Sequence, residues 1–294
     1  MWLLCSPPKG LDQPLHLPSK VTSSGSLFYF KRSRKPELAG DATNCLSCPA
    51  ETECQYSAKR IYYDMLLKKG TTSWPVSIVV PDIEECNSLE TARERLMQKL
   101  GEDYTAEMSQ GDIDSRPWYG RCVYEAGNDV CDDQTVTITW EEDTLPETNA
   151  GSGNGGHKRP KVRHGKSATI RMVAFTEKIC ERRTRVYGTK GELETDSSTI
   201  RIYNFASGEA ETLRPHLAEG GHGGGDGGLA RQFVLAIDAV KNNGMSVDEA
   251  QRTFVGCTLE DVIRSHAMVF AAEDARRGGR VVDWAEWWDK EVKG

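Results

Sequence analysis

The sequence predicts an α+β fold with an open, largely antiparallel or mixed β-sheet and helices on one face. Short runs of β-branched and aromatic residues follow one another between residues 121 and 213, with no helical pattern between them. Helical periodicity is confined to the first hundred residues and to the last seventy or so. Consecutive strands without crossover helices favour antiparallel pairing over a doubly wound parallel sheet. We expect a single domain over residues 1–294.

The first hundred residues are expected to hold the end of a helix, a strand and two further helices. Trp2-Leu3-Leu4 is a short apolar run that meets Pro7-Pro8 almost at once, as at the end of a helix. Strand-favouring residues follow over residues 20–30. Helices are predicted over Ser57–Lys69, with Gly70 as C-cap, and over Ser88–Leu100. Their expected buried stripes are Ile61, Met65 and Leu66 in the first and Leu89, Ala92, Leu96 and Leu100 in the second.

A series of strands is expected after Pro117. The glycines of Tyr187–Glu192 predict a hairpin turn within the series. Residues 146–165 are rich in glycine, asparagine and basic residues and have no apolar periodicity, so they are expected to be a flexible insertion. The predicted strands are Arg121–Tyr124, Thr135–Trp140, Ala168–Phe175, Arg183–Tyr187, Glu192–Thr195, Thr199–Phe205 and Ala210–Leu213.

Two helices are expected to close the chain. The first covers Leu229–Lys241, and the second covers Thr258–Arg277. The second ends at Gly278-Gly279 with two arginines in its last turn, where cations interact favourably with the helix dipole. The stripe expected to be buried in the first helix is Phe233, Ala236, Ile237 and Val240.

Composition excludes several classes of protein. The formal net charge is −7, and the only basic run, His157–Lys166, lies in the insertion, so we expect no nucleic-acid partner. No apolar run approaches the roughly 20 residues that span a bilayer, so no membrane partner is expected. Nine cysteines without a secretion signal indicate reduced thiols rather than a disulfide framework. The expected location is therefore the cytoplasm.

Two glycine-rich stretches have the spacing of a dinucleotide fingerprint. Gly151–Gly156 runs into a basic, proline-containing segment instead of a helix, and Gly220–Gly228 opens a helix but follows no abutting strand. No cofactor-binding residue is therefore assigned. The second stretch has two interpretations. It is either a connector in which Asp226 caps the helix, or a loop lining a polar pocket in which His222 reaches a substrate hydroxyl.

Cysteines and carboxylates form two further candidate sites. Cys45 and Cys48 have C-x-x-C spacing, and Cys54 follows closely; the three thiols hold a metal such as zinc if a fourth ligand comes from elsewhere, or are free and packed. Asn128 and Asp129 begin a run dense in carboxylates. Either the side chains of this run hydrogen-bond the backbone of a turn, or its first two residues hydrogen-bond a polyol at the sheet edge.

Several segments together resemble the C-terminal domain of the Gfo/Idh/MocA family of NAD(P)-dependent oxidoreductases. The resemblance covers nearly the whole chain apart from the insertion and is specific only in combination. The segments that carry it are Cys54–Tyr62 (CQYSAKRIY), Cys122–Tyr124 with Asn128–Val130, Met172–Thr176 (MVAFT), Arg183–Leu193 (RTRVYGTKGEL), the Gly220–Asp226 loop and His266–Glu273 (HAMVFAAE).

In that family an N-terminal Rossmann domain binds NAD or NADP and carries a Glu-Lys-Pro lysine, and an Asp-x-x-x-His-type motif opens the C-terminal domain. The helix bearing that second motif commonly ends in a Leu-Trp-Leu-Leu-like run, which Met1–Leu4 resembles, and neither motif is present here. The resemblance therefore implies a truncated substrate-side and oligomerisation domain of a sugar or polyol oxidoreductase, inactive alone and without an assigned catalytic residue or bound cofactor.

The resemblance also implies a homo-oligomer formed through the sheet. Two alternatives are a non-catalytic binding or regulatory protein with the same fold, and a metal-binding structural module based on the cysteines. His222, Asp226, Asn128 and Asp129 are the expected substrate-side residues, and Cys45, Cys48 and Cys54 are the candidate metal ligands.

Overall fold

The computed structural model describes residues 1–6, 13–125, 127, 129–145, 162–177, 181–216 and 221–294. These residues form two compact units. The smaller unit is Gly25–Gln134 with Met172–Ala174, and the larger contains the rest. Three strands contribute residues to both units, so the expectation of a single domain stays a prediction.

The larger unit contains a four-stranded sheet in the order β10-β1-β2-β5. Strands β1 and β10 are antiparallel, with Val21 paired to Val282. The segments of β1 and β2 are antiparallel too: the N–H of Ser19, before β1, donates to the oxygen of Thr139, near the end of β2, at 2.8 Å, and the contact at the other end of β1 runs in the same antiparallel direction. The antiparallel expectation is confirmed. The strands are β1 (Lys20–Ser26), β2 (Asp133–Trp140), β5 (Lys166–Val173) and β10 (Val282–Asp283).

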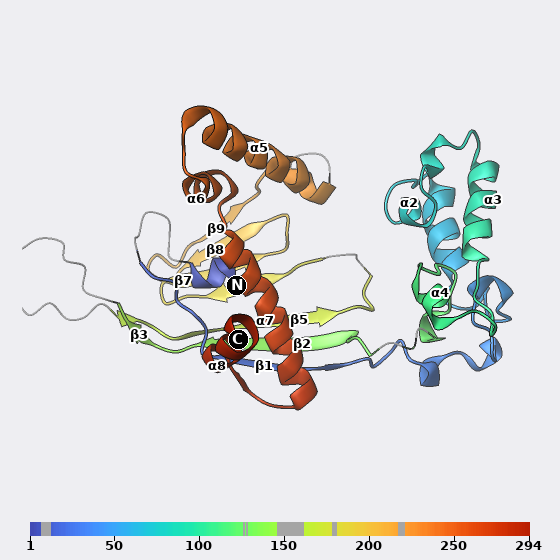
Figure 1. Ribbon diagram of the computed structural model, residues 1–294, viewed down its shortest axis with the longest axis horizontal. Helices are drawn as coiled ribbons and strands as arrows, with labels where there is room; N and C mark the ends of the chain where they lie inside the picture. The colour runs from blue at the N-terminus through green and yellow to red at the C-terminus, as the bar shows by residue number, and fades with distance from the viewer. Residues whose placement is uncertain (7–12, 126, 128, 146–161, 178–180, 217–220) are drawn as a thin grey trace, which may run out of the picture. The chain divides into compact units, whose positions relative to one another are not determined.

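Helix α7 (Leu259–Gly278) packs on this sheet together with α1 (Trp2–Cys5) and α8 (Trp284–Trp288). Figure 1 shows α7 crossing over the strands of this sheet. Four of its five buried core residues are alanines, which lets the backbone of the helix approach the sheet closely. Thr258 caps its start in a capping box, and Gly279, with φ of 57°, caps its end as predicted. The shared core includes Cys5, Val21, Ile138, Trp140, Ala267, Met268, Ala271, Ala272, Ala275, Val282 and Trp284.

The end of the predicted insertion is not a loop. Val162–Arg163 forms β4 and pairs antiparallel with β3 (Asp143–Thr144). The Arg163 guanidinium also pairs with the carboxylate of Asp143, which explains why a basic residue lies here. Residues 146–161 of the insertion lie outside the described residues.

A second sheet is an antiparallel meander, in agreement with the predicted strands and hairpin. The register places Val186, Leu193 and Ile202 side by side on one face, while Tyr187, Glu192 and Tyr203 alternate onto the other. Val186 is 51% exposed and Ile202 is 37% exposed, so the apolar face is open to solvent among the described residues. The strands are β6 (Thr184–Tyr187), β7 (Gly191–Thr195), β8 (Ile200–Asn204) and β9 (Ala210–Leu213).

Helix α5 (Gly225–Asn243) packs against α6 (Val247–Ala250) and the π-helical turn Gln251–Val255. The predicted buried stripe is wrong for Phe233 and Ile237, which are exposed. The buried contacts come instead from small residues that let the helices approach, with Ala236, Ala239 and Ala250 at the centre and Val240, Met245, Phe254 and Val255 around them.

The smaller unit is built from short helices. Ser88 caps α3 (Leu89–Leu100) through the N–H of Thr91, and the predicted Ala92, Leu96 and Leu100 are buried, whereas Leu89 is exposed. The other helix bounds are α2 (Val76–Val79) and α4 (Gln110–Asp114), a π-helical segment Lys59–Leu66, and single 3-10 turns at Arg32–Arg34, Glu37–Ala39, Cys45–Ser47, Leu67–Lys69, Ile83–Glu85 and Val123–Glu125.

Two predictions in this unit need correction. The helix over Ser57–Lys69 exists and Gly70 closes it with φ of 88°, but its buried apolar residues are Ala58 and Leu67, and Met65 is exposed. The predicted strand Arg121–Tyr124 is only an isolated bridge from Arg121 to Asn44, followed by a 3-10 turn. None of the helices in the described part of the chain is long and apolar enough to cross a membrane.

The 3-10 turn Gly221–Gly224 precedes α5, and the π-helical turn Asp289–Lys293 follows α8.

Candidate functional site

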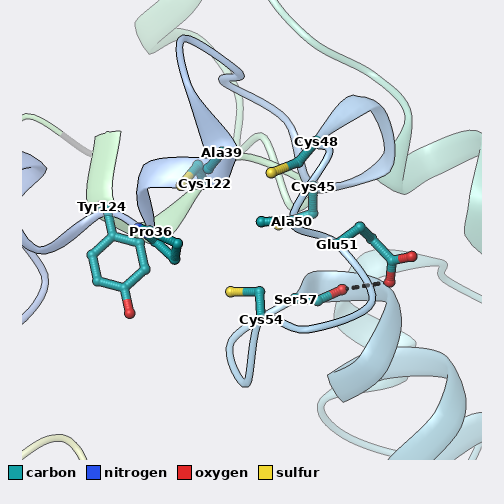
Figure 2. A pocket seen from close by; sticks show the side chains of 10 residues that line it. All are labelled: Pro36, Ala39, Cys45, Cys48, Ala50, Glu51, Cys54, Ser57, Cys122 and Tyr124. Carbon is teal, nitrogen blue, oxygen red and sulfur yellow. Dashed lines mark hydrogen bonds between the residues drawn. The ribbon is translucent and has the colours of Figure 1, made fainter.

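Four cysteines line one small cavity in the smaller unit (Figure 2). Cys45, Cys48 and Cys54 are the predicted group, and Cys122 joins them from a distant part of the chain. The cavity has a volume of about 20 Å³, which is room for a single water-sized body. Cys45, Cys48, Cys54 and Cys122 form no disulfide with one another. The structure therefore brings the three predicted thiols together and adds a fourth.

The C-x-x-C pair is held by a single 3-10 turn. The N–H of Cys48 donates to the oxygen of Cys45 at 3.3 Å. Asn44 precedes the turn, and its side-chain oxygen accepts the N–H of Leu46 at 2.8 Å. The buried amide nitrogen of Asn44 donates in turn to the oxygen of Leu100 at 2.8 Å, which ties the turn to the end of α3. The pair is therefore fixed by backbone and buried polar contacts.

Cys122 reaches the cavity because its segment pairs with the segment before the turn. The N–H of Cys122 donates to the oxygen of Thr43 at 2.7 Å, and the N–H of Cys45 donates to the oxygen of Gly120 at 2.8 Å. Gly120 is required at this close approach, since a Cβ there would lie 1.7 Å from the oxygen of Leu100. The sequence separation between Cys54 and Cys122 hides this contact from any spacing rule.

The one carboxylate lining the cavity is already engaged. Glu51 accepts a hydrogen bond from the hydroxyl of Ser57 at 2.9 Å and forms an ion pair with Lys59 at 2.9 Å. Ser57 is fully buried. Figure 2 shows the thiols of Cys48 and Cys54 facing the space between their loops. Sulfur is thus the chemistry that this cavity offers.

Burial keeps the innermost thiols protonated. Burial raises the pKa of Cys45 to about 11, and the neighbouring Cys122, Cys54 and Cys48 add to the shift. Burial also raises the pKa of Cys122, although the charge of Lys35 acts in the opposite direction. Within the described residues, no three His, Cys, Asp or Glu side chains already converge as a metal-ligand set. As they stand, the Cys45 and Cys122 thiols are neutral and packed.

His222 and Asp226 form an exposed pair at the start of α5. The Nδ1 atom of His222 lies 3.0 Å from both carboxylate oxygens of Asp226. Gly224, not Asp226, occupies the N-cap position, and no side chain caps the helix. Asp226 therefore orients the imidazole instead of capping. The His222 side chain is 79% exposed, and the polar pocket expected around it stays a prediction.

The backbone of this loop is unusual. His222 has φ of 51°, in the left-handed region, and Gly223 and Gly224 follow with φ of 65° and 81°. This conformation turns the imidazole back toward the first turn of the helix. A Cβ at Gly227 or Gly228 would meet nothing within 4 Å, so no packing within the described residues requires glycine at those two positions.

The remaining predicted substrate residues are less informative. Asn128 lies outside the described residues, and Asp129 is exposed in the smaller unit. Asp132, in the same carboxylate-rich run, has a structural role that was not predicted individually. Its carboxylate accepts the N–H groups of Phe28 and Tyr29 at 2.7 Å and of Phe30 at 3.0 Å. This contact joins segments about a hundred residues apart, so it is tertiary, and both interpretations of the run stay predictions.

An open apolar groove of about 700 Å³ runs beside α7 in the larger unit. His266 lines it, and its Nδ1 atom is 2.9 Å from the oxygen of Val262, one turn earlier. Trp287 closes one side and donates its indole N–H to Asp274 at 2.8 Å. Among the described residues, the groove offers hydrophobic contacts and the second ring nitrogen of His266. These groups do not indicate a particular reaction.

No protein-family model, no curated protein and no solved structure matches this chain.

Proposed function

We propose that this chain supplies the substrate-side domain of an oxidoreductase that acts on a sugar or another polyol. The observation that carries the proposal is the His222–Asp226 pair, in which the carboxylate fixes one imidazole nitrogen and leaves the other free. The resemblance of several segments to the C-terminal domain of the Gfo/Idh/MocA family, with its sheet and covering helices, supports the same assignment.

The pair suits proton exchange with a hydroxyl group. Because Asp226 accepts the Nδ1–H of His222, the neutral imidazole presents an unprotonated Nε2. Such a nitrogen accepts the proton that leaves a hydroxyl as it is oxidised, and the nearby carboxylate stabilises the imidazolium that results. The side chain is exposed, so a ligand has access to it.

The start of α5 adds a second contribution. Its first N–H groups and the positive end of the helix dipole favour ligand oxygens or a carboxylate. Glycine at positions 227 and 228 leaves that backbone uncovered. Phe233 and Ile237 lie about two and three turns further along the face that carries Asp226 and are exposed. They provide an apolar surface for a further domain beside the ligand.

The loop before α5 lacks the setting of a dinucleotide fingerprint. The glycine-rich loop before α5 follows β9, an edge strand of an antiparallel meander, and not a strand of a parallel βαβ unit. We therefore assign NAD or NADP to no residue here and derive no hydride step. Catalysis by this chain alone is not proposed.

Binding of polyols to the full chain tests the proposal. We expect saturable binding of one or more members of a panel of inositols, aldohexoses and hexonates, followed by ligand-detected NMR. His222→Ala should weaken that binding by about tenfold or more, the loss expected for a good hydrogen-bonding pair. Its melting temperature should stay near that of the parent, because the side chain packs against little.

His164 provides the matched control. Its Nδ1 atom lies 3.2 Å from a carboxylate oxygen of Glu142, and both side chains are exposed, but no glycine-rich helix start adjoins it. His164→Ala should leave binding unchanged. Equal losses in the two variants, or no saturable ligand in the panel, would remove the support for a polyol site at His222.

A second candidate function is a non-catalytic protein that binds a partner. The exposed apolar face of the β6–β9 sheet and the open groove beside α7 favour it. The polyol experiment separates the two, since a purely protein-binding role predicts no polyol affinity at His222. We also propose that the β6–β9 face joins two copies of the chain, as the resemblance implies.

A further inference from the structure

We infer that Cys45, Cys48, Cys54 and Cys122 bind one Zn²⁺ ion through four thiolates, as a structural site independent of the polyol function. The first argument is that four cysteines line one cavity. Three separate segments, a 3-10 turn, a loop before the Lys59–Leu66 helix and the chain around residue 122, bring a cysteine to the same cavity. Four cysteines are the commonest all-sulfur ligand set for zinc.

The second argument is size and enclosure. A cavity of about 20 Å³ admits one ion but no organic ligand, because small-molecule sites are roughly 300 Å³ or larger. It is also small for an iron–sulfur cluster, which contains several metal and sulfide atoms. The Glu51 carboxylate is occupied by Ser57 and Lys59. A fully sulfur-ligated ion has no open position, which makes the site structural and not catalytic.

The third argument comes from the chain around the cavity. Residues 27–58 contain only three 3-10 turns of three residues each and no strand. The buried side chains in this stretch are all small: Ala39, Asn44, Cys45, Ala50, Ser57 and Ala58. A long irregular segment that buries so little apolar surface needs another source of order, and small folds commonly use a metal for it.

Zinc binding requires the four side chains to turn their sulfurs toward one centre, because within the described residues no three of them already form a ligand set. The backbone hydrogen bonds of Cys45 and Cys122 hold their two segments side by side. The ion displaces a proton from every thiol that is protonated, giving one Zn²⁺ bound by four thiolates and up to four protons released to solvent. No electron is transferred.

Metal analysis of the intact chain tests the inference. The protein is expressed with added zinc, purified without chelator and measured by plasma mass spectrometry. We expect one zinc per chain. Cys122→Ser and Cys45→Ser should each fall below about 0.1 equivalent, since a three-thiolate remnant loses most of its affinity. Cys86→Ser is the control, because Cys86 belongs to the same unit but does not line the cavity, and it should keep its zinc.

X-ray absorption of the unaltered protein keeps the test decisive if a variant fails to fold. Four sulfur neighbours at about 2.3 Å from zinc support the inference. A zinc-free protein, iron in place of zinc, a shell containing nitrogen or oxygen, or full zinc retention in Cys122→Ser would each overturn it. None of these outcomes depends on polyol binding, so failure of this site is distinguishable from failure of the proposed function.

Discussion

The backbone N–H of Cys122 donates to the carbonyl oxygen of Thr43 at 2.7 Å. This contact depends on Gly120, where a Cβ would lie 1.7 Å from the Leu100 oxygen and 2.8 Å from the amide nitrogen of Asn44. Gly120→Ala must therefore push the 118–122 segment away from α3. We expect a loss of about 3 kcal/mol or more of unfolding free energy, at the upper end of overpacking costs. Chemical denaturation measures it, and an unchanged midpoint would contradict this packing.

Asp132 is expected to be a major stabilising residue of the smaller unit. It is buried, and its carboxylate accepts three consecutive backbone N–H groups from Phe28 to Phe30. In Asp132→Asn the side-chain NH2 group faces at least one of these backbone N–H groups, and two donors cannot form a hydrogen bond. We expect the free energy of unfolding to fall by about 2–3 kcal/mol. The exposed Asp41 of the same unit serves as the control, and Asp41→Asn should have little effect.

The Asp132 contribution should also depend on pH. Burial opposes ionisation, but the three N–H donors outweigh it and hold the pKa of Asp132 below its usual range. A carboxyl group with a lowered folded-state pKa stabilises fully above its unfolded pKa, about 3.9, and loses that stabilisation as the pH falls through the folded value. The difference between the parent and Asp132→Asn should therefore be largest near neutral pH and shrink below about pH 4. A constant difference from pH 7 to pH 2 would show that the charge is not responsible.

Local patterns predicted much of this fold. Alternating β-branched residues located β7, β8 and β9 to within a residue or two, and the glycines and arginines of the last turn located the C-terminal end of α7. Helical periodicity identified α5 and two of its four expected packed residues, Ala236 and Val240, but not the exposure of Phe233 and Ile237. Periodicity shows which residues share a stripe and not which part of it finds a partner. The alanines pack, and Phe233 is exposed.

The candidate sites show the same limit. The C-x-x-C pair and Cys54 were visible because they are close in sequence, whereas Cys122 depends on the bridge between Asn44 and Arg121. That bridge arises from a tertiary approach permitted by one glycine. No local signal encodes it, and only the count of remaining cysteines hinted at a fourth thiol.

The chain as given should not bind NAD or NADP. A dinucleotide site needs a strand–turn–helix setting that presents a helix start to a pyrophosphate. In the sequence, the first glycine-rich match runs into a basic, proline-containing segment instead of a helix. In the structure, the second match follows an antiparallel edge strand. Titration calorimetry should show no saturable heat with either nucleotide. A micromolar dissociation constant would instead indicate that the loop before α5 binds phosphates.

The β6–β9 sheet should mediate self-association. Its apolar face carries Val186, Leu193 and Ile202, and a charge placed there would have to be desolvated in an interface. Light scattering after size exclusion should show a dimer or larger species for the parent and a monomer for Val186→Glu. Thr212→Glu, on the opposite face of the same sheet, should leave the oligomer intact. A monomeric parent would remove this sheet as an interface.

The substitution Gly228→Ala tests whether the start of α5 binds a ligand or has a purely structural role. A Cβ at this position would meet nothing within 4 Å, and the residue lies within the first turn of a 19-residue helix. Gly228→Ala should therefore raise the unfolding free energy, by up to about 0.5–1 kcal/mol, because alanine loses less backbone entropy on folding. If a polyol approaches the helix start beside His222, the added methyl group obstructs it. We expect the variant to melt at or above the parent temperature while its polyol affinity falls by about threefold or more, which corresponds to roughly 0.7 kcal/mol of binding free energy. Unchanged affinity would mean that the ligand does not contact this turn. A lower melting temperature would mean that an unseen contact already occupies the space beside Gly228.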